Sequence, residues 1–403
     1  MKKWIALALS LCLCLNFAVS GSAKTVSMEY EATDLEVPLS ESVMTAATPD
    51  TLQIKAKSAI LMEPMTGKIL YESNIDEQTA PASITKIMPL ILIMEALERG
   101  DITLDTTVTA SEHACSMGGS QIWLEPGETM TVDELLKATV IASANDATVA
   151  LGELIAGSEE GFVALMNEKA KALGMNNTNF VNCTGLDAEG HLTTAHDVAI
   201  MSSELIKHEL IKKYSTVWMD SLRDGQSELV NTNKLVRFYE GCTGLKTGTT
   251  SLAGSCLSAT AQKNGMQLVA VVMKAENSTE RFEGAKKLLN YGFANFNFVS
   301  IEADLKEQNK IPTKNAAVPY ATFEAKDKLD LLLPKRDAAN ITQKIELKEF
   351  IEAPAKKGDN VGQIKVVNGE TELGIIELNL AEDIDKLSFT HTFIWLIKAL
   401  FTL

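Results

Sequence analysis

The stretch Pro81-Ala82-Ser83-Ile84-Thr85-Lys86-Ile87-Met88 places a serine three residues before a lysine, at the start of an apolar segment. If the segment is helical, Ser83 and Lys86 lie on one face about one turn apart, because residues i and i+3 are helix neighbours. A serine hydroxyl is a poor nucleophile near neutral pH, and a lysine whose pKa is lowered can accept its proton. The spacing therefore indicates an activated serine, although an isolated Ser-x-x-Lys pattern also arises by chance on solvated helices.

Two further motifs follow this stretch in order. Ser143-Ala144-Asn145 ends an apolar run that begins at Leu135, and Lys246-Thr247-Gly248 lies on a predicted strand after Gly244. The triple S-x-x-K, S-x-N and K-T-G is the signature of penicillin-binding proteins and serine β-lactamases. Chance explains the ordered triple poorly, so we interpret the three motifs as parts of one active site.

The residues around the motifs narrow this resemblance to the low-molecular-mass D-alanyl-D-alanine carboxypeptidases. The resemblance covers about residues 55–296. It implies an α/β, β-lactamase/transpeptidase-like catalytic domain, with an antiparallel sheet flanked by helices plus a helical subdomain, followed by a small all-β domain. The similar segments are residues 81–88, Ser143-Ala-Asn-Asp-Ala147, Met166-Asn167, Leu173-Gly-Met175, Thr184-Gly-Leu186, Gly190-His191 and Gly244-Leu-Lys-Thr-Gly-Thr-Thr250.

The resemblance implies a catalytic role for each motif residue. Ser83 would attack the carbonyl between two D-alanines of a peptidoglycan stem peptide, forming an acyl-enzyme that water cleaves. Lys86 is expected to be the base for Ser83, and Asn145 to hold Lys86 and the substrate amide. Ser143 would relay a proton between Lys86 and the leaving amine. Lys246 would lower the pKa of Lys86; which lysine or serine is the base in each half-reaction stays open.

The resemblance also implies where the substrate's charges are held. The backbone N–H groups of Ser83 and Thr249 would donate to the oxyanion. Thr249 stands where several relatives have histidine, a departure that alters carboxylate binding without removing the backbone donor. His191 is expected to order the nearby loop rather than to take part in the reaction. The substrate-binding residues are expected to be Lys246, Thr247, Gly248, Thr249 and Arg281.

The N-terminal residues predict export. Residues 1–23 have a basic start, an apolar middle and small residues before a cleavage point after Ala23, as in a secretory signal peptide. Leu13 is too large for a lipoprotein site at Cys14. Residues 24–52 are acidic with little periodicity and predict a flexible spacer. The net charge of -16 argues against nucleic acid as a partner.

Cysteines and histidines give no sign of a metal or cofactor. Of 6 cysteines, Cys12 and Cys14 fall in the signal peptide, which leaves Cys115, Cys183, Cys242 and Cys256. An exported protein can form disulfides, but a chain of 403 residues builds its own core, so buried free thiols are expected. The sequence contains neither Cys-x-x-Cys nor His-x-x-x-His, and no metal site is predicted.

The hydrophobic pattern divides the exported chain into a catalytic domain (53–298), a β-rich domain (299–385) and a tail (386–403). Short apolar runs with turn signals predict the β-rich domain. The tail is too short to span a bilayer, which needs about 20 apolar residues. It predicts an amphipathic helix on the outer face of the cytoplasmic membrane, with a packing helix of the β-domain as the alternative.

Local patterns predict particular elements of the catalytic domain. A hairpin is expected from Ser58 to Tyr71, and another at Lys263-Asn264-Gly265. Thr131-Val-Asp-Glu134 is a capping box. Pro89 is expected to kink the nucleophile's helix about one turn beyond Lys86.

Three other functions could use the same motifs or the same fold. A class A β-lactamase carries a deacylating Glu-x-x-Leu-Asn, and the nearest segment, Glu189-Gly-His-Leu-Thr193, lacks the asparagine. We therefore expect β-lactams to acylate Ser83 and stay attached. An inactive wall-binding protein would lack a member of the constellation, yet all are present. Endopeptidase action on cross-linked peptides uses the same residues and stays open.

Overall fold

The computed structural model describes residues 52–305, 309–338, 340–389, 393 and 397. The predicted signal peptide (1–23) lies outside the described residues, as does the predicted spacer up to residue 51.

An antiparallel sheet with strand order β2-β1-β9-β8-β7 forms the centre of the catalytic part. Strand β1 pairs with both β2 and β9, so the beginning and the end of this region meet in one sheet. Asn264 and Gly265 have φ angles of 50° and 79°, as a two-residue type I′ turn requires. Both predicted hairpins are thus present. The strands are β1 (Ala56–Glu63), β2 (Lys68–Ser73), β7 (Cys242–Thr250), β8 (Gly254–Lys263) and β9 (Met266–Ala275).

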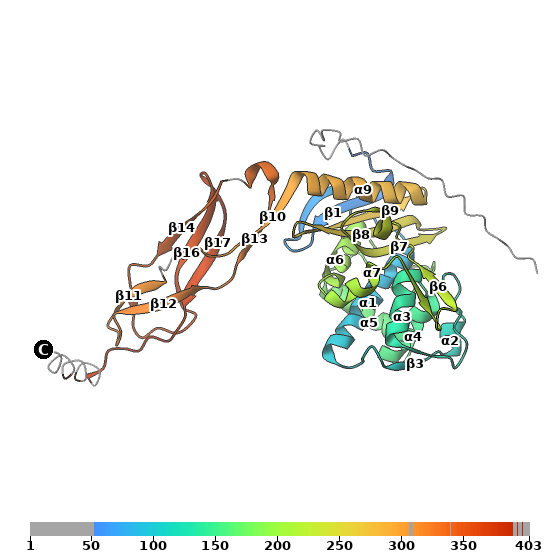
Figure 1. Ribbon diagram of the computed structural model, residues 1–403, viewed down its shortest axis with the longest axis horizontal. Coiled ribbons are helices and arrows are strands. Elements are labelled where there is room, and N and C mark those ends of the chain that lie inside the picture. Colours follow the sequence, from blue (N-terminus) through green and yellow to red (C-terminus); the bar gives the residue numbers. More distant parts are fainter. Residues whose placement is uncertain (1–51, 306–308, 339, 390–392, 394–396, 398–403) are drawn as a thin grey trace, which may run out of the picture. The chain divides into compact units, whose positions relative to one another are not determined.

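Helices cover both faces of this sheet. Helix α9 (Ser278–Asn295) lies along one face (Figure 1), where Gly292 lets the helix approach so closely that a Cβ there would be 2.5 Å from Leu268. The opposite face packs against α6 (Ala195–Leu205). Beyond α6, α1 (Ile87–Arg99) and α4 (Asn145–Ala156) build the core of the predicted helical subdomain. The sheet therefore separates two apolar layers.

Shorter elements surround these helices. The predicted capping box is present, since Thr131 and Glu134 bond each other's backbone N–H groups before α3. These elements are β3 (Thr107–Thr109), α2 (Glu112–Cys115), β4 (Thr129–Thr131), α3 (Val132–Lys137), the π-helix η3 (Ala138–Ala142), α5 (Glu159–Ala172), η4 (Glu209–Ile211), α7 (Lys212–Ser215), β5 (Met219–Leu222), β6 (Ser227–Val230) and α8 (Leu235–Phe238).

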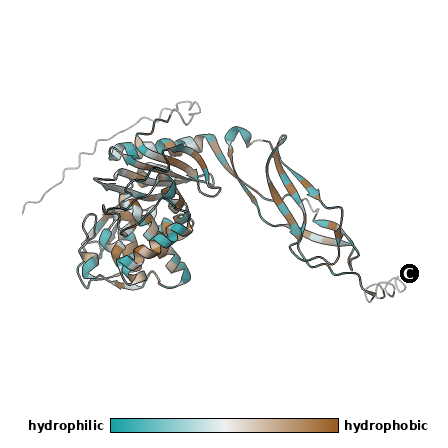
Figure 2. Ribbon diagram, turned by 180° about the vertical axis from the view of Figure 1, so that it is seen from behind, coloured by the Kyte–Doolittle hydropathy of each residue, from teal (hydrophilic) through white to brown (hydrophobic). Residues whose placement is uncertain are grey.

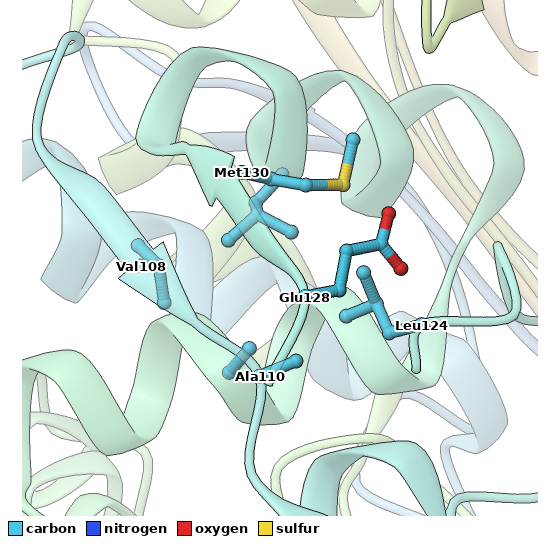
Figure 3. Close-up of a pocket in the computed structure, with 7 residues that line it drawn as sticks. Val108, Ala110, Leu124, Glu128 and Met130 are labelled. Atoms are coloured by element: carbon cyan, nitrogen blue, oxygen red, sulfur yellow. The ribbon is translucent and has the colours of Figure 1, made fainter. Parts of the chain in front are cut away.

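Figure 3 shows a small hollow between β3, β4 and the neighbouring helices. Apart from Glu128 it is lined by apolar side chains, and Glu128 forms an ion pair with Arg223 at 2.8 Å. None of the lining residues belongs to the three motifs, so the hollow is separate from the predicted site. The lining residues are Val108, Ala110, Leu124, Glu128, Met130, Leu135 and Ala150.

The C-terminal part is built from strands, as predicted. Strand β10 (Phe296–Ile301) pairs with β13 (Leu329–Pro334) and runs across the predicted domain boundary between residues 298 and 299. A second sheet has the order β14-β16-β17-β12-β11-β15, and its strands carry hydrophobic stretches (Figure 2). The elements are β11 (Lys310–Lys314), β12 (Tyr320–Ala325), η5 (Lys335–Asp337), β14 (Ile341–Leu347), β15 (Ile351–Glu352), β16 (Asn360–Asn368) and β17 (Thr371–Leu380).

The segment around Ser83 differs from the prediction. Ala82–Lys86 is a 3₁₀-helix (η2), and α1 begins only at Ile87. With about three residues per turn, positions i and i+3 eclipse, so Ser83 and Lys86 are aligned more closely than on an α-helix. Pro89 is the third residue of α1, in the first turn, where backbone N–H groups have no partner within the helix. The premise of the predicted kink, that Pro89 lies about six residues into an α-helix, is therefore wrong.

Candidate active site

Lys86 contacts three other residues of the candidate site. Its Nζ lies 3.1 Å from Ser83 Oγ, and it donates to Asn145 Oδ1 at 2.5 Å and to the Thr184 carbonyl at 2.7 Å. These contacts come from η2, α4 and the loop before α6. They hold the amine next to the hydroxyl that it is expected to deprotonate.

Burial sets the charge of this amine. The Lys86 side chain is fully buried, and burial lowers its pKa to about 7, although the charges of Cys183 and Asp146 act in the opposite direction. A lysine with this pKa is partly neutral at physiological pH and can accept a proton. Burial, rather than the predicted charge of Lys246, is the main cause of the lowered pKa.

Ser143 and Lys246 form the second pair. Lys246 Nζ donates to Ser143 Oγ at 2.8 Å, so the structure pairs Ser143 with Lys246, whereas the prediction linked it to Lys86. Ser143 ends the π-helix η3 with a φ of 64°, a strained left-handed conformation often kept at functional sites. Burial, followed by the charges of Lys86 and Arg281, holds the pKa of Lys246 well below its usual value.

Asn145 is oriented by a loop that the sequence analysis missed. Its Nδ2 donates to the Gly118 carbonyl at 2.6 Å, and its backbone N–H donates to the Ser120 carbonyl at 2.7 Å. The amide oxygen therefore faces Lys86. The adjacent Asp146 carboxylate accepts the N–H groups of Ile122 and Leu124, which fixes the same loop. The pair Gly118-Gly119 was the available signal for a close backbone approach.

Arg281 reaches the K-T-G strand from α9. Its Nη1 donates to the Gly248 carbonyl at 3.0 Å and to Thr249 Oγ1 at 2.8 Å. Thr247 Oγ1 donates to Thr232 Oγ1 at 2.7 Å, which fixes the direction of its hydroxyl. The predicted substrate-binding residues thus lie together at the end of β7, with Arg281 buried behind them.

Main-chain atoms wall the nucleophile on two sides. A Cβ at Gly248 would lie 2.9 Å from the Pro81 carbonyl and 3.0 Å from Ser83 N, so β7 packs directly against η2. This contact brings the Ser83 N–H beside the strand that continues to Thr249. On the other side, a Cβ at Gly185 would lie 1.8 Å from the Ala82 carbonyl oxygen.

His191 orders the loop that contains Gly185. Its Nδ1 accepts the Val181 N–H at 3.0 Å, so the proton of the neutral ring is on Nε2, which donates to Thr85 Oγ1 at 2.8 Å. Burial lowers the His191 pKa to about 4, which keeps the ring neutral. These contacts fit the predicted loop-ordering role. The Thr184 carbonyl is the loop's contribution that sequence reasoning missed, although Thr184-Gly-Leu186 marked its position.

The chain is similar to known protein families and to known proteins. A family model described as D-alanyl-D-alanine carboxypeptidase matches residues 42–277, and one described as penicillin-binding protein 5, C-terminal domain, matches residues 302–386. The chain belongs to the D-alanyl-D-alanine carboxypeptidase family. The carboxypeptidase DacF of Bacillus subtilis (strain 168) is 43% identical over 83% of this chain and 87% of its own.

Solved structures of similar proteins support the carboxypeptidase assignment. Penicillin-binding protein 5 from Haemophilus influenzae has a TM-score of 0.73 and 30% identity, covering 83% of this chain and 98% of its own. Penicillin-binding protein D2 from Listeria monocytogenes, in an ampicillin-bound form, has a TM-score of 0.55 and 31% identity, covering 60% and 99%. The predicted transpeptidase-like domain followed by a β-rich part is thereby confirmed.

The cysteines in the described part of this carboxypeptidase are free thiols. Cys115, Cys183, Cys242 and Cys256 are unpaired by disulfides. Cys183 and Cys256 are buried as predicted, whereas Cys115 and Cys242 are half-buried. Burial raises the pKa of Cys242 and Cys256 to about 11, so both stay protonated thiols near neutral pH.

Replacing Gly185 of this carboxypeptidase with alanine is expected to lower the rate of acylation by about 10- to 100-fold. The new Cβ would collide with the Ala82 carbonyl, and the residue would keep a φ of +88°, so η2 must shift. The rate of labelling by a fluorescent penicillin measures the effect. Gly190→Ala is the matched control, because Gly190 has a φ of +76° but its nearest neighbour is 3.8 Å away. Equal losses in the two variants would show that backbone strain, not the collision, matters.

Proposed function

We propose that this protein removes the terminal D-alanine from peptidoglycan stem peptides through an acyl-enzyme on Ser83. The contact between Lys86 Nζ and Ser83 Oγ, at 3.1 Å and with the Lys86 pKa near 7, carries the proposal. It supplies a half-buried nucleophile in direct contact with a buried base. Because the chain belongs to a D-alanyl-D-alanine carboxypeptidase family, we propose that the substrate is a peptide ending in D-alanyl-D-alanine.

Acylation follows from these positions. Neutral Lys86 accepts the Ser83 proton while Oγ attacks the carbonyl of the penultimate D-alanine. The backbone N–H groups of Ser83 and Thr249 donate to the oxyanion. The protonated Lys86 then gives this proton up to the amine of the terminal D-alanine as the C–N bond breaks, with Ser143, which Lys246 holds at 2.8 Å, as the relay.

Positive charge at the end of β7 suits the carboxylate of the terminal D-alanine. Lys246 and Arg281 are both buried there, in a chain whose net charge is -16. Arg281 donates to Thr249 Oγ1, which orients that hydroxyl toward a bound carboxylate. The Arg281 guanidinium, which stays charged, and Lys246 when it is protonated attract the C-terminal carboxylate of the substrate, which favours carboxypeptidase action over cleavage within a peptide.

β-Lactams are proposed to acylate the same serine. They imitate the D-alanyl-D-alanine end, and the structure of the Listeria protein was solved with ampicillin bound. Glu189, the nearest sequence counterpart of a deacylating glutamate, is exposed on its loop. We therefore propose that the acyl-enzyme formed with a β-lactam is hydrolysed slowly.

D-Alanine release from a peptide ending in D-alanyl-D-alanine tests this function, with a fluorescent penicillin as a probe of the nucleophile. Release together with covalent labelling supports a carboxypeptidase. Labelling without release would contradict it and move the function toward endopeptidase, transpeptidase or binding protein.

The exported location and the membrane tail also remain proposals. Residues 389, 393 and 397 are helical, and their side chains are 85%, 53% and 39% exposed. A spacing of four residues places these apolar side chains on one helix face, which supports an interfacial helix on a membrane surface. The rest of the tail beyond Phe389 lies outside the described residues. Over the part of the chain that is described, we find no helix sufficiently long and apolar to cross a bilayer.

Deleting residues 388–403 is expected to abolish sedimentation with phosphatidylglycerol vesicles and to leave D-alanine release unchanged. The deletion removes the exposed apolar face but keeps Leu387, whose N–H donates to the Asn315 carbonyl at 2.8 Å. The full-length variant Phe389→Asp/Phe393→Asp should behave similarly, because charges on that face oppose insertion. Undiminished vesicle binding in both variants would rule out the anchor and favour a packing helix.

A further inference from the structure

The turn at residues 182–186 supplies the main-chain contact to Lys86. The Thr184 carbonyl accepts a hydrogen bond from Lys86 Nζ at 2.7 Å, and both residues are buried. The other contacts of this Nζ, Ser83 Oγ and Asn145 Oδ1, come from side chains. A main-chain contact depends on the conformation of the turn, so the residue that sets this conformation also sets the contact.

Asn182 organises that turn through its side chain. Its Oδ1 accepts the Gly185 N–H at 2.7 Å, the Thr184 N–H at 3.2 Å and the Thr184 hydroxyl at 3.2 Å. Its Nδ2 donates to the Leu186 carbonyl at 2.9 Å. The half-buried Asn182 amide therefore makes hydrogen bonds to Thr184, Gly185 and Leu186 of this turn.

The hydrogen bond from the Gly185 N–H to Asn182 Oδ1 also orients the Thr184 carbonyl. The Gly185 N–H and the Thr184 C=O belong to one planar peptide unit and point in opposite directions. When Asn182 Oδ1 holds the N–H, it also aims the C=O at Lys86. A hydrogen bond to the N–H side polarises the carbonyl and strengthens the bond that the carbonyl accepts.

Other side chains hold the rest of the turn independently. Glu159 Oε1 accepts the Cys183 N–H at 3.0 Å, and His191 Nδ1 accepts the Val181 N–H at 3.0 Å. Gly185 also packs against the Ala82 carbonyl. Loss of the Asn182 side chain should therefore tilt one peptide unit without releasing the loop.

We propose that Asn182 is a positioning residue that fixes the Thr184 carbonyl against Lys86 and so tunes the base that activates Ser83. The inference rests on the proposed function of Lys86 as that base. The titratable groups that face Lys86 are Lys246 from β7, Asp146 from α4 and the Cys183 thiol in the turn itself. Glu159 from α5 lies behind Cys183.

Two substitutions at Asn182 should move the base in opposite directions. Asn182→Ala removes the acceptor, so the ammonium form of Lys86 loses part of its stabilisation and its pKa falls. Asn182→Asp keeps an acceptor for the N–H groups of Thr184 and Gly185 and adds a negative charge, which raises that pKa. A residue with only a structural role would not produce opposite shifts.

The test measures the rate of labelling of the full exported chain by a fluorescent penicillin from about pH 5 to about pH 9. Asn182→Ala should lower the plateau rate about tenfold and move the acidic limb to lower pH. Asn182→Asp should move that limb to higher pH. Asn179→Ala is the matched control, because this exposed asparagine of the same loop donates to the Gly190 carbonyl at 2.9 Å and should leave the profile unchanged.

The outcomes separate this inference from the proposed function. Opposite shifts of the acidic limb, with Tm within a few degrees of the wild type, support the positioning role. Profiles that coincide with the wild type, or that shift in the same direction, overturn it. Absence of labelling in the wild-type protein would instead refute the proposed function on which it rests.

Discussion

Replacing Ser83 with alanine is expected to abolish covalent labelling by penicillin and to lower D-alanine release by about 10⁴-fold or more. The Oγ of Ser83 is the atom that forms the acyl bond, and Lys86 Nζ lies 3.1 Å from it. The substitution removes one oxygen from a half-buried position at the start of η2, so the fold should persist. D-Alanine release from a D-alanyl-D-alanine peptide and labelling on a gel measure both effects.

The matched control for this substitution is Ser300→Ala. Ser300 is an exposed serine on β10 and should retain full release and labelling. An unchanged Tm of Ser83→Ala would show that chemistry, rather than folding, is lost. Persistent labelling of Ser83→Ala would place the nucleophile elsewhere and refute the mechanism.

Replacing Lys86 with arginine is expected to lower acylation by about 10³-fold at every pH, because a guanidinium cannot accept a proton. In the wild type, the acylation rate should rise with pH through about 7, where Lys86 becomes neutral, and then level off. Labelling rates across this range measure both effects. Lys326→Arg, at an exposed ion pair of the β-rich part, is the control. A flat pH profile in the wild type would exclude Lys86 as the titrating base.

The pH dependence of the free energy of unfolding also reports on the pKa of Lys86. Its pKa is about 7 in the folded protein against an ordinary value of 10.5, so the unfolded chain binds more protons between these values. The free energy of unfolding should therefore rise with pH across this window and be lowest, from this group, below about 7. Lys86→Met should remove the part of this dependence that comes from Lys86, leave the part that comes from Lys246, and abolish activity. Urea titrations at several pH values can compare the two proteins.

The sequence was sufficient where chemistry resides in side chains. Ser83, Lys86, Ser143, Asn145 and Lys246 were identified by residue type and spacing, and the structure brings them together. Hairpins were predictable because alternation and an Asn-Gly turn are local signals. Arg281 could be placed only by resemblance, since nothing in the pattern of α9 marks it as reaching β7.

The rest of the site depends on main-chain atoms, which every residue carries. The Thr184 carbonyl, the Gly118 carbonyl and the Ser120 carbonyl contact the site through loops that are distant in sequence. The residue type at a position therefore does not predict that its carbonyl contacts the site. The 3₁₀ conformation of η2 was missed for a related reason, because its helical period differs little from that of an α-helix over five residues.

The main-chain walls beside Ser83 constrain how this protein could evolve under antibiotic pressure. Gly185 and Gly248 leave no space for even a methyl group against Pro81, Ala82 and Ser83. Mutations that put a larger side chain at Gly185 or Gly248 would therefore disable both the enzyme and drug binding. Resistant variants should instead accumulate substitutions at exposed residues that follow these glycines in the sequence, such as Leu186, which is 37% exposed, and Thr249.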